Sequence, residues 1–339
     1  MRPGKMRERP QMMRKGLSFG LWAAIAAVCC FSCNGQGRTT RNTEQATADT
    51  LQGMVYELPL PEVPSALTAP EERAEYIISR FWDGMDFTDT LRSRNRLFME
   101  QNFVNFLSLF PHAKQEALPP HIGKLLKRAA ADSVTLRIVN DLAEHYLDNP
   151  NSPMRCEEYY ILFLEELLRL PGLSEYDCIR PAYRLETAKK NRPGTVATDF
   201  SYTGRNGNRQ TLHGTRGKRL LLLFYDPACS HCSEILDALH ENPLLAELIS
   251  PKELTVLAVY TEGDRKLWDE TKESMPQEWI VAIDDSRIVE RELYALPAMP
   301  VIYLLDAGKR VILKDAPLER LEAWLSENNI FQKKYERPR

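Results

Sequence analysis

The sequence predicts an all-helical region followed by an α/β domain, and three observations support this. From Pro70 to about Arg192, apolar residues recur at helical spacing and prolines separate the segments. After this stretch, short apolar runs typical of strands alternate with helical segments. One of these runs, Leu220 to Tyr225, is unbroken, which is typical of a strand buried on both faces. A chain of 339 residues is long enough for about two domains, which we place at 70–192 and 193–335.

The N-terminus has the features of a secretion signal. Residues 1–16 contain six basic side chains and one acid, and residues 17–33 form an uncharged segment. A basic stretch before an apolar one is typical of a signal peptide. At seventeen residues the segment is also at the short limit for a membrane span, so an uncleaved signal anchor is the alternative.

The end of this segment, with Ser32 before Cys33 and a polar tail after it, resembles the lipobox of bacterial lipoproteins. In that motif, a small residue precedes a cysteine that becomes lipidated and N-terminal. The usual leucine three positions upstream is Cys30 here, which leaves Cys29 and Cys30 as alternative sites. The resemblance implies a signal peptide over residues 1–33. It also implies a mature chain that is lipid-anchored at Cys33 in the cell envelope, facing the periplasm or the exterior.

The composition is that of an ordinary soluble protein body. The net charge is −3 and 43% of the residues are hydrophobic, so no basic surplus indicates a nucleic-acid partner. Residues 34–69 are polar and then rich in proline, without a sustained period. We expect them to form a tether between the anchor and the helices.

The helical region is expected to begin at Pro70, where proline and two acids form a favourable first turn, and its first helix ends by Gly84. Further helices are predicted at 94–110, 121–131, 134–147, 154–170 and 178–190. Four aromatic residues are expected in the core rather than in a ligand site: Phe98, Phe103, Phe106 and Phe110. Nothing in this half of the chain predicts catalysis.

Four of the seven cysteines lie beyond the signal region, an even number that suits two pairs in an oxidising compartment. Cys156 falls early in one predicted helix and Cys178 at the start of the next. Either a disulfide joins them or they are two buried free thiols, because spacing alone does not define disulfide geometry.

The C-terminal region is predicted to alternate between strands and helices. Asn206-Gly207 is a strong hairpin signal between strands at 199–202 and 209–212. Further strands are expected at 254–260, 279–283, 301–305 and 310–313. Helices are expected at 264–273, at 286–296 with Ser286 as its cap, and from Pro317 onward.

Two cysteines three residues apart follow the most apolar strand. Asp226-Pro227 ends the strand, and Cys229 and Cys232 lie at the start of a segment with helical apolar spacing. A thiol at a helix N-terminus lies at the positive end of the helix dipole, which favours thiolate over thiol. Residues i and i+3 share a helix face, so Cys232 can reach the sulfur of Cys229. This arrangement predicts a reversible dithiol/disulfide pair.

Residues 193–335 resemble a thioredoxin-like domain, closest to the membrane-tethered TlpA-type oxidoreductases of the cell envelope. The matching features are Pro193-Gly194 before Asp199-Phe200, the Cys-Ser-His-Cys motif after a buried strand, Trp268 and Trp279, and Ala298-Met299-Pro300-Val301. The preceding helices resemble a domain of unassigned function found in some envelope lipoproteins, especially around residues 80–87.

This resemblance implies a central mixed sheet flanked by helices and a role for each residue of the motif. Cys229 is then the nucleophile, and Cys232 resolves the mixed disulfide. Pro300 is expected in the cis form beside the redox pair. Met299 and Pro300 are expected to supply the backbone edge that binds the substrate.

Two family positions for a buried acid are apolar here, and this leaves the proton acceptor of Cys232 open. The position six residues before the first cysteine is Leu223, and the position three residues after the second is Ile235. Glu234 is one position away from the second of these. Asp226 lies near the motif, where it could equally form a turn.

His231 lies inside the motif and has two interpretations. A partly protonated imidazole stabilises the dithiol form and makes the domain more oxidising, or the residue is an exposed polar filler. A metal site built from Cys229, His231 and Cys232 lacks a fourth ligand at a recognisable spacing. We therefore expect no metal and no other cofactor.

The sequence thus predicts an envelope-tethered thiol–disulfide oxidoreductase. Its partners are protein thiols and disulfides, together with a redox partner in the envelope. The direction of electron flow stays open. The alternative hypothesis is a binding or scaffold lipoprotein, in which the helical domain and the thioredoxin fold recruit an envelope partner without chemistry.

Overall fold

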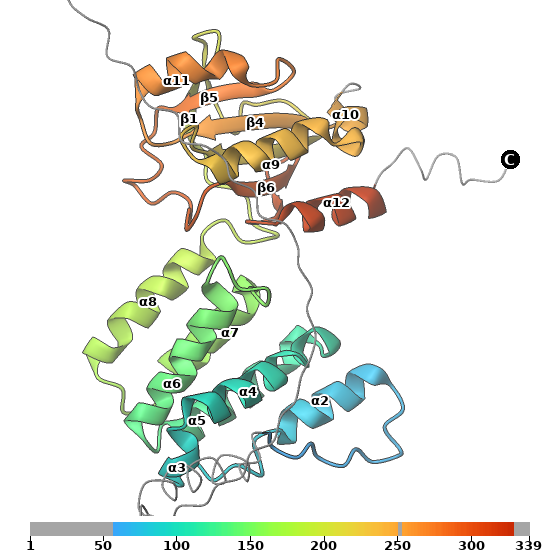
Figure 1. Ribbon diagram of the computed structural model, residues 1–339, viewed down its shortest axis with the longest axis vertical. Coiled ribbons are helices and arrows are strands. Elements are labelled where there is room, and N and C mark those ends of the chain that lie inside the picture. Colours follow the sequence, from blue (N-terminus) through green and yellow to red (C-terminus); the bar gives the residue numbers. More distant parts are fainter. Residues whose placement is uncertain (1–56, 250–252, 329–339) are drawn as a thin grey trace, which may run out of the picture. The chain divides into compact units, whose positions relative to one another are not determined.

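The computed structural model describes residues 57–249 and 253–328, and its first part is helical (Figure 1). The main α-helices are α2 (Pro70–Arg80), α3 (Thr90–Ser93), α4 (Arg96–Leu107), α5 (Pro119–Ala129), α6 (Ser133–Ala143), α7 (Glu157–Leu168) and α8 (Glu175–Lys189). Short 3-10 turns lie at Phe110–His112 and Gln115–Ala117, and a π-helical turn at Glu144–Asp148 extends α6. The helices predicted in this region are therefore confirmed, with ends that differ by a few residues.

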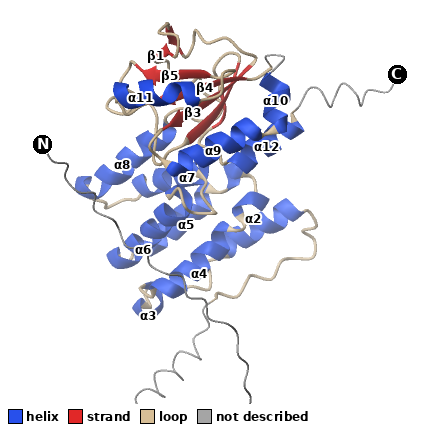
Figure 2. Cartoon of the chain, turned by 45° about the horizontal axis from the view of Figure 1, so that its top comes forward, coloured by secondary structure: helices blue, strands red, loops and turns tan. Residues whose placement is uncertain are grey.

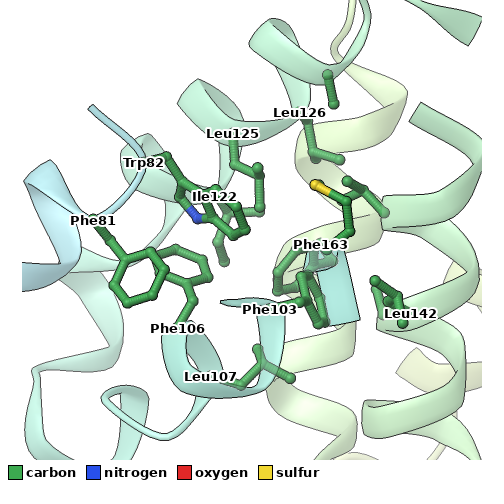
Figure 3. Packing of buried hydrophobic residues seen from close by; sticks show 14 of the residues in the cluster. Phe81, Trp82, Phe103, Phe106, Leu107, Ile122, Leu125, Leu126, Leu142 and Phe163 are labelled. Atoms are coloured by element: carbon green, nitrogen blue, oxygen red, sulfur yellow. The ribbon is translucent and has the colours of Figure 1, made fainter. Parts of the chain in front are cut away.

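One hydrophobic core holds these helices together. The four predicted core aromatics are all buried: Phe98, Phe103, Phe106 and Phe110. Figure 3 shows Phe103 and Phe106 among side chains from neighbouring helices, including Ile122 of α5 and Phe163 of α7. The rings of Phe103 and Phe163 are 5.5 Å apart at a tilted angle, a favourable arrangement for aromatic pairs.

The segment before α2 is partly packed against the helices. Leu58, within the predicted tether of residues 34–69, is buried in the helical core, and its backbone N–H donates to the side chain of Asn102. The predicted signal peptide, Cys33 and the first part of the tether lie outside the described residues. In the part of the chain that the structure describes, no helix is long and apolar enough to cross a membrane.

The second part of the chain forms a mixed seven-stranded sheet, shown in red in Figure 2. The strands are β1 (Ser201–Gly204), β2 (Arg209–Thr211), β3 (Arg219–Tyr225), β4 (Thr255–Tyr260), β5 (Ile280–Asp284), β6 (Val301–Asp306) and β7 (Val311–Leu313). They lie in the order β2-β1-β5-β4-β3-β6-β7. β3, β4 and β5 are parallel to one another, whereas β6 runs antiparallel to β3. The predicted hairpin at Asn206-Gly207 joins β1 to β2.

Alternate residues of the central strands point to two cores on opposite faces of the sheet. On one face, Leu221, Leu223 and Tyr225 of β3 pack with residues of four helices. These helices are α9 (Ser230–Glu241), α10 (Pro243–Ile249), α11 (Arg265–Thr271) and α12 (Leu318–Glu327). β3 is thus buried on both faces, as its unbroken apolar run predicts.

Irregular segments cover the other face, where the sequence predicts a helix at 286–296. That prediction is wrong, since the residues form turns. Arg287 and Glu292 have φ angles of 56° and 48°, in the left-handed region that an α-helix does not contain. The Ser286 hydroxyl accepts the backbone N–H of Ser201 instead of capping a helix. The segment still buries Ile288 and Tyr294 against the sheet.

Buried charges join the helices to the α/β part. The Lys314 side chain is 4% exposed, and its ammonium lies 2.6 Å from a Glu157 carboxylate oxygen at the start of α7. It also donates to the backbone carbonyls of Ala188 and Lys190, at 2.9 and 2.7 Å. A buried charge needs such a complete set of partners. Arg192 pairs with Glu158 beside this cluster.

Candidate active site

The two motif cysteines lie where β3 passes into α9. Asp226 forms the turn between β3 and α9. Its carboxylate accepts the backbone N–H of Ala228 at 2.9 Å, and its backbone carbonyl accepts the N–H of Cys229 at 3.1 Å. Cys229 is the N-cap residue of α9. Its Sγ accepts the backbone N–H of Cys232 at 3.4 Å. Because Cys229 is the N-cap residue, its sulfur lies at the positive end of the helix dipole. The first turn of α9 contains no acid that would compete for this position.

The two thiols have different surroundings. Cys229 is partly exposed, whereas Cys232, in the first turn of α9, is fully buried. Burial raises the pKa of the Cys232 thiol to about 12, and the hydrogen bond with Cys229 and the charge of Asp226 act in the same direction. A hydrogen bond from the backbone of Asp226 acts against this increase. An accessible thiol at a helix start and a buried one behind it suit the roles of attacking and resolving cysteine.

Pro300 lies at the same edge of the sheet as the cysteines. Val301 pairs with Phe224 in the antiparallel β3–β6 ladder, so Pro300 precedes β6 where β3 ends. The Met299–Pro300 peptide bond is cis, as the family resemblance implies. Met299 is partly buried and contacts both cores of the sheet. Strand register therefore brings the two motif cysteines and the expected substrate edge to the same end of the sheet.

Comparison with known structures places this chain in a family. A crystal structure of a thioredoxin-like protein from Bacteroides caccae has 36% sequence identity to this chain and a TM-score of 0.76. The match covers 80% of this chain and 98% of that one. The chain belongs to the thioredoxin-like family. Its residues 32–191 match the family model described as a domain of unknown function, DUF5106.

Two further structures each match a smaller share of this chain. The C-terminal domain of an uncharacterized protein from Bacteroides fragilis has 35% identity and a TM-score of 0.40, and the match covers 40% of this chain and 99% of that one. The thioredoxin domain of a thiol-disulfide oxidoreductase from Bacteroides vulgatus has 22% identity and a TM-score of 0.36, with coverage of 40% and 96%. No match was found among curated proteins.

The remaining motif residues of this thioredoxin-like region are exposed. The Nδ1 atom of His231 lies 3.6 Å from a carboxylate oxygen of Glu234, and the two side chains are 64% and 75% exposed. At the family position for a buried acid, the sheet instead carries Leu223, which is fully buried.

Within the described residues, no group of three or more His, Cys, Asp or Glu side chains is arranged to hold a metal ion.

Cys156 and Cys178 are separate free thiols in the structure. The structure has no disulfide between them, and the alternative of two buried free thiols is met only in part, because both side chains are partly exposed. Cys156 is the N-cap residue of α7 and contacts the helical core, and Cys178 lies in the first turn of α8. Burial raises the pKa of the Cys156 thiol.

The structure also contains two cavities that the sequence did not predict. One of about 220 Å³ lies behind the start of α9 and is lined by Tyr225, Asp226 and Ser233 among others. The other, of about 530 Å³, is lined mainly by charged side chains of the helical region and includes Pro297 of the segment before β6. Charges at helical spacing, such as Glu144 with Asp148 and Arg180 with Arg184, are the only sequence signal for this second cavity.

Proposed function

We propose that this chain catalyses thiol–disulfide exchange on protein substrates through Cys229 and Cys232. The observation that carries the proposal is the position of Cys229. It is a partly exposed thiol at the N-cap of α9, three residues before a buried second thiol and at the sheet edge that carries cis-Pro300. A pure scaffold needs none of these three features. Membership of the thioredoxin-like family supports the proposal.

The exchange proceeds in two displacements. The Cys229 thiolate attacks one sulfur of a substrate disulfide, the substrate S–S bond breaks, and the released sulfur takes up a proton. The Cys232 thiol then gives its proton to the second substrate sulfur as it attacks Sγ of Cys229. The substrate leaves as a dithiol, and the chain keeps a Cys229–Cys232 disulfide. Two electrons pass to the substrate, and a redox partner in the envelope restores the starting state. The reverse sequence oxidises a substrate dithiol.

The position of Cys232 makes its deprotonation the demanding part of this cycle. Its thiol is buried with a raised pKa, and neither Leu223 nor the partly buried Ile235 can accept a proton. The Asp226 charge raises the pKa of the Cys232 thiol further, and one oxygen of its carboxylate accepts the backbone N–H of Ala228. Transfer of the Cys232 proton directly to the departing substrate sulfur avoids the need for a separate base.

We also propose that the chain works in the cell envelope, anchored by a lipid on Cys33 and facing the periplasm or the exterior. The basic stretch, the uncharged segment and Ser32-Cys33 support this. Expression in a bacterial host with and without Cys33→Ser, followed by membrane fractionation, tests the anchor. Wild-type protein should sediment with membranes, and equal distribution of the two forms would contradict it.

Covalent trapping tests the exchange reaction. Cys232→Ser removes the resolving thiol, so mixed disulfides between Cys229 and substrate proteins should accumulate in cells and disappear on reduction. The Cys229→Ser/Cys232→Ser double variant is the control and should trap nothing. If Cys232→Ser accumulates no more covalent adduct than the double variant, the proposed activity is wrong and the binding-module hypothesis takes its place.

A further inference from the structure

The 530 Å³ cavity in the helical region has a predominantly charged wall. Its arginines come from α4 and α8: Arg96, Arg180 and Arg184. Its acids are Asp141, Glu144 and Asp148. The π-helical turn Glu144–Asp148 supplies two of these acids and also His145, and π-helical turns occur frequently at functional sites.

The acids of this wall are more enclosed than two of its cations. Glu144 is shared by Arg180 and Arg184, at 2.6 and 2.8 Å, and Arg184 also pairs with Asp148. Burial raises the pKa of the Asp148 carboxyl. The side chain of Arg180, in contrast, is 68% exposed. It can therefore reach a further anion without leaving Glu144 unpaired.

Arg96 is the second accessible cation of the wall. Its side chain is 55% exposed, and its guanidinium lies 3.9 Å from Asp141, at the outer limit of an ion pair. Such a loose pair contributes little by itself and is readily exchanged for a better partner. Guanidinium groups bind carboxylates through two parallel hydrogen bonds, which favours a carboxylate as the ligand.

One residue of the cavity wall, Pro297, is close along the chain to the expected substrate edge. Pro297 lies three residues before cis-Pro300, and three extended residues span at most about 10 Å. The segment that carries Pro297 is fixed to the helices, because Lys190 pairs with Glu292 at 3.1 Å. The side chain of Asn191 also donates to the carbonyl of Leu293 at 2.9 Å. A polypeptide bound along Met299–Pro300 thus reaches the cavity within a few residues.

We propose that this cavity is a specificity subsite that binds an acidic side chain of the protein substrate, a few residues from the cysteine undergoing exchange. Arg96 and Arg180 make the contacts with its carboxylate. The inference rests on the proposed function, because the ligand is the polypeptide whose disulfide Cys229 attacks. It assigns a role in substrate choice to the helical region.

A pair of synthetic peptides tests the subsite. Each carries one cysteine as a mixed disulfide with 5-thio-2-nitrobenzoate, and glutamates or glutamines at about three to five residues on either side. Reduced protein in excess releases the coloured thiolate in a single turnover, so the rate as a function of protein concentration yields a half-saturation value and a limiting rate. We expect half-saturation at about tenfold lower concentration for the glutamate peptide, with equal limiting rates.

The chain offers a matched control for the key variant. Arg96→Ala/Arg180→Ala should remove the preference for glutamate and leave the limiting rate unchanged. Arg92→Ala/Arg169→Ala removes two arginines of the same region that are 54% and 65% exposed, each paired with an acid three residues away, and should keep the preference. Thermal unfolding of each double variant establishes that it is folded. A preference that is absent in the wild type, or that survives Arg96→Ala/Arg180→Ala, overturns the subsite while the exchange activity stands.

A binding measurement separates this inference from the proposed function. The Cys229→Ser/Cys232→Ser variant cannot exchange disulfides, and its affinity for fluorescent glutamate and glutamine peptides with serine in place of cysteine is measured by anisotropy. An arginine-dependent preference for glutamate supports the subsite even if the wild type releases no coloured thiolate, which would refute the exchange activity alone. Equal affinity for both peptides overturns the subsite.

Discussion

Helices α7 and α9 both begin at a cysteine, and their first turns differ at every position. Cys156 is the N-cap residue of α7 and is followed by Glu157, Glu158 and Tyr159. Cys229 is the N-cap residue of α9 and is followed by serine, histidine and a second cysteine. The first turn of α7 thus has two acids, whereas that of α9 has none.

This difference shows which features turn a cysteine at a helix start into a reactive one. At α7, carboxylates already occupy the positive end of the helix dipole and are held by Lys314 and Arg192. Burial raises the pKa of the Cys156 thiol, and no thiol lies three residues further on. At α9, no acid competes with Cys229 for the positive end of the helix, and Cys232 donates its backbone N–H to the Cys229 sulfur. A helix N-terminus alone is therefore not enough.

The largest effect expected from this comparison concerns the two N-cap cysteines themselves. Cys229→Ser removes the nucleophile and should lower the rate of disulfide exchange by about a thousandfold or more. Cys156→Ser replaces a thiol that packs against the helical core and has no role in the proposed reaction, so the exchange rate should stay within about twofold. Single-turnover reduction of a model protein disulfide measures both. A large loss for Cys156→Ser with an unchanged fold would show that the helical region contributes a reactive thiol.

The same comparison shows what the sequence could and could not predict. The strand–turn–cysteine element around Cys229 is local, because the apolar run, the proline and the cysteine pair are neighbours along the chain. The two acids after Cys156 are equally visible, but their partner Lys314 is more than 150 residues away and is found only by folding. Ion pairs such as Arg184 with Asp148, which line the charged cavity, also join residues far apart in the sequence, so the sequence alone did not predict them.

The incorrect helix at 286–296 has a different cause. Its apolar spacing was real, since Ile288 and Tyr294 are buried against the sheet. Turns place these two side chains on the sheet as well as a helix would. The Asp284 carboxylate accepts the backbone N–H groups of Ser286 and Ile288, both at 2.6 Å, which stabilises the turn that replaces the helix start.

The next expected effect is a pH dependence shared by Cys156 and Cys232. Burial raises the pKa of both thiols, that of Cys232 to about 12. Only the thiolate is alkylated, so a raised pKa means that the rate keeps increasing as the pH rises above the ordinary thiol range. In the Cys229→Ser variant, alkylation of Cys232 should increase about a hundredfold from pH 8 to pH 10. Iodoacetamide labelling with peptide mapping by mass spectrometry follows each cysteine separately.

Cys229→Ser also removes a hydrogen bond that raises the pKa of Cys232, but burial, the larger cause, remains. A plateau of the Cys232 rate below pH 9 would therefore mean that burial is not what controls this thiol. The Cys156 rate in the same samples is an internal comparison, since its increase should also continue above pH 9.

A smaller effect is expected when the first turn of α9 is made to resemble that of α7. Ser230→Glu places a carboxylate where α7 has Glu157, next to Cys229 and at the positive end of the helix. The added charge competes with the thiolate, so alkylation of Cys229 at pH 7 should slow by about three- to tenfold. Ser230→Gln is the control, because it matches the side chain in size without the charge. Equal slowing by both variants would assign the effect to shape instead of charge.

The smallest effect concerns His231, which stands where α7 has Glu158. His231 and Glu234 are both largely exposed and lie 3.6 Å apart, so solvent screens the imidazole and the acid offsets it. If the histidine stabilises the dithiol form, His231→Ala should lower the reduction potential by about 10–20 mV, and Glu234→Ala should raise it by a similar amount. Equilibration with glutathione buffers measures both potentials. Because both charges are at the surface, the two shifts in reduction potential should become smaller together in high salt. Shifts of the same sign for the two variants would rule out a role for the His231 charge.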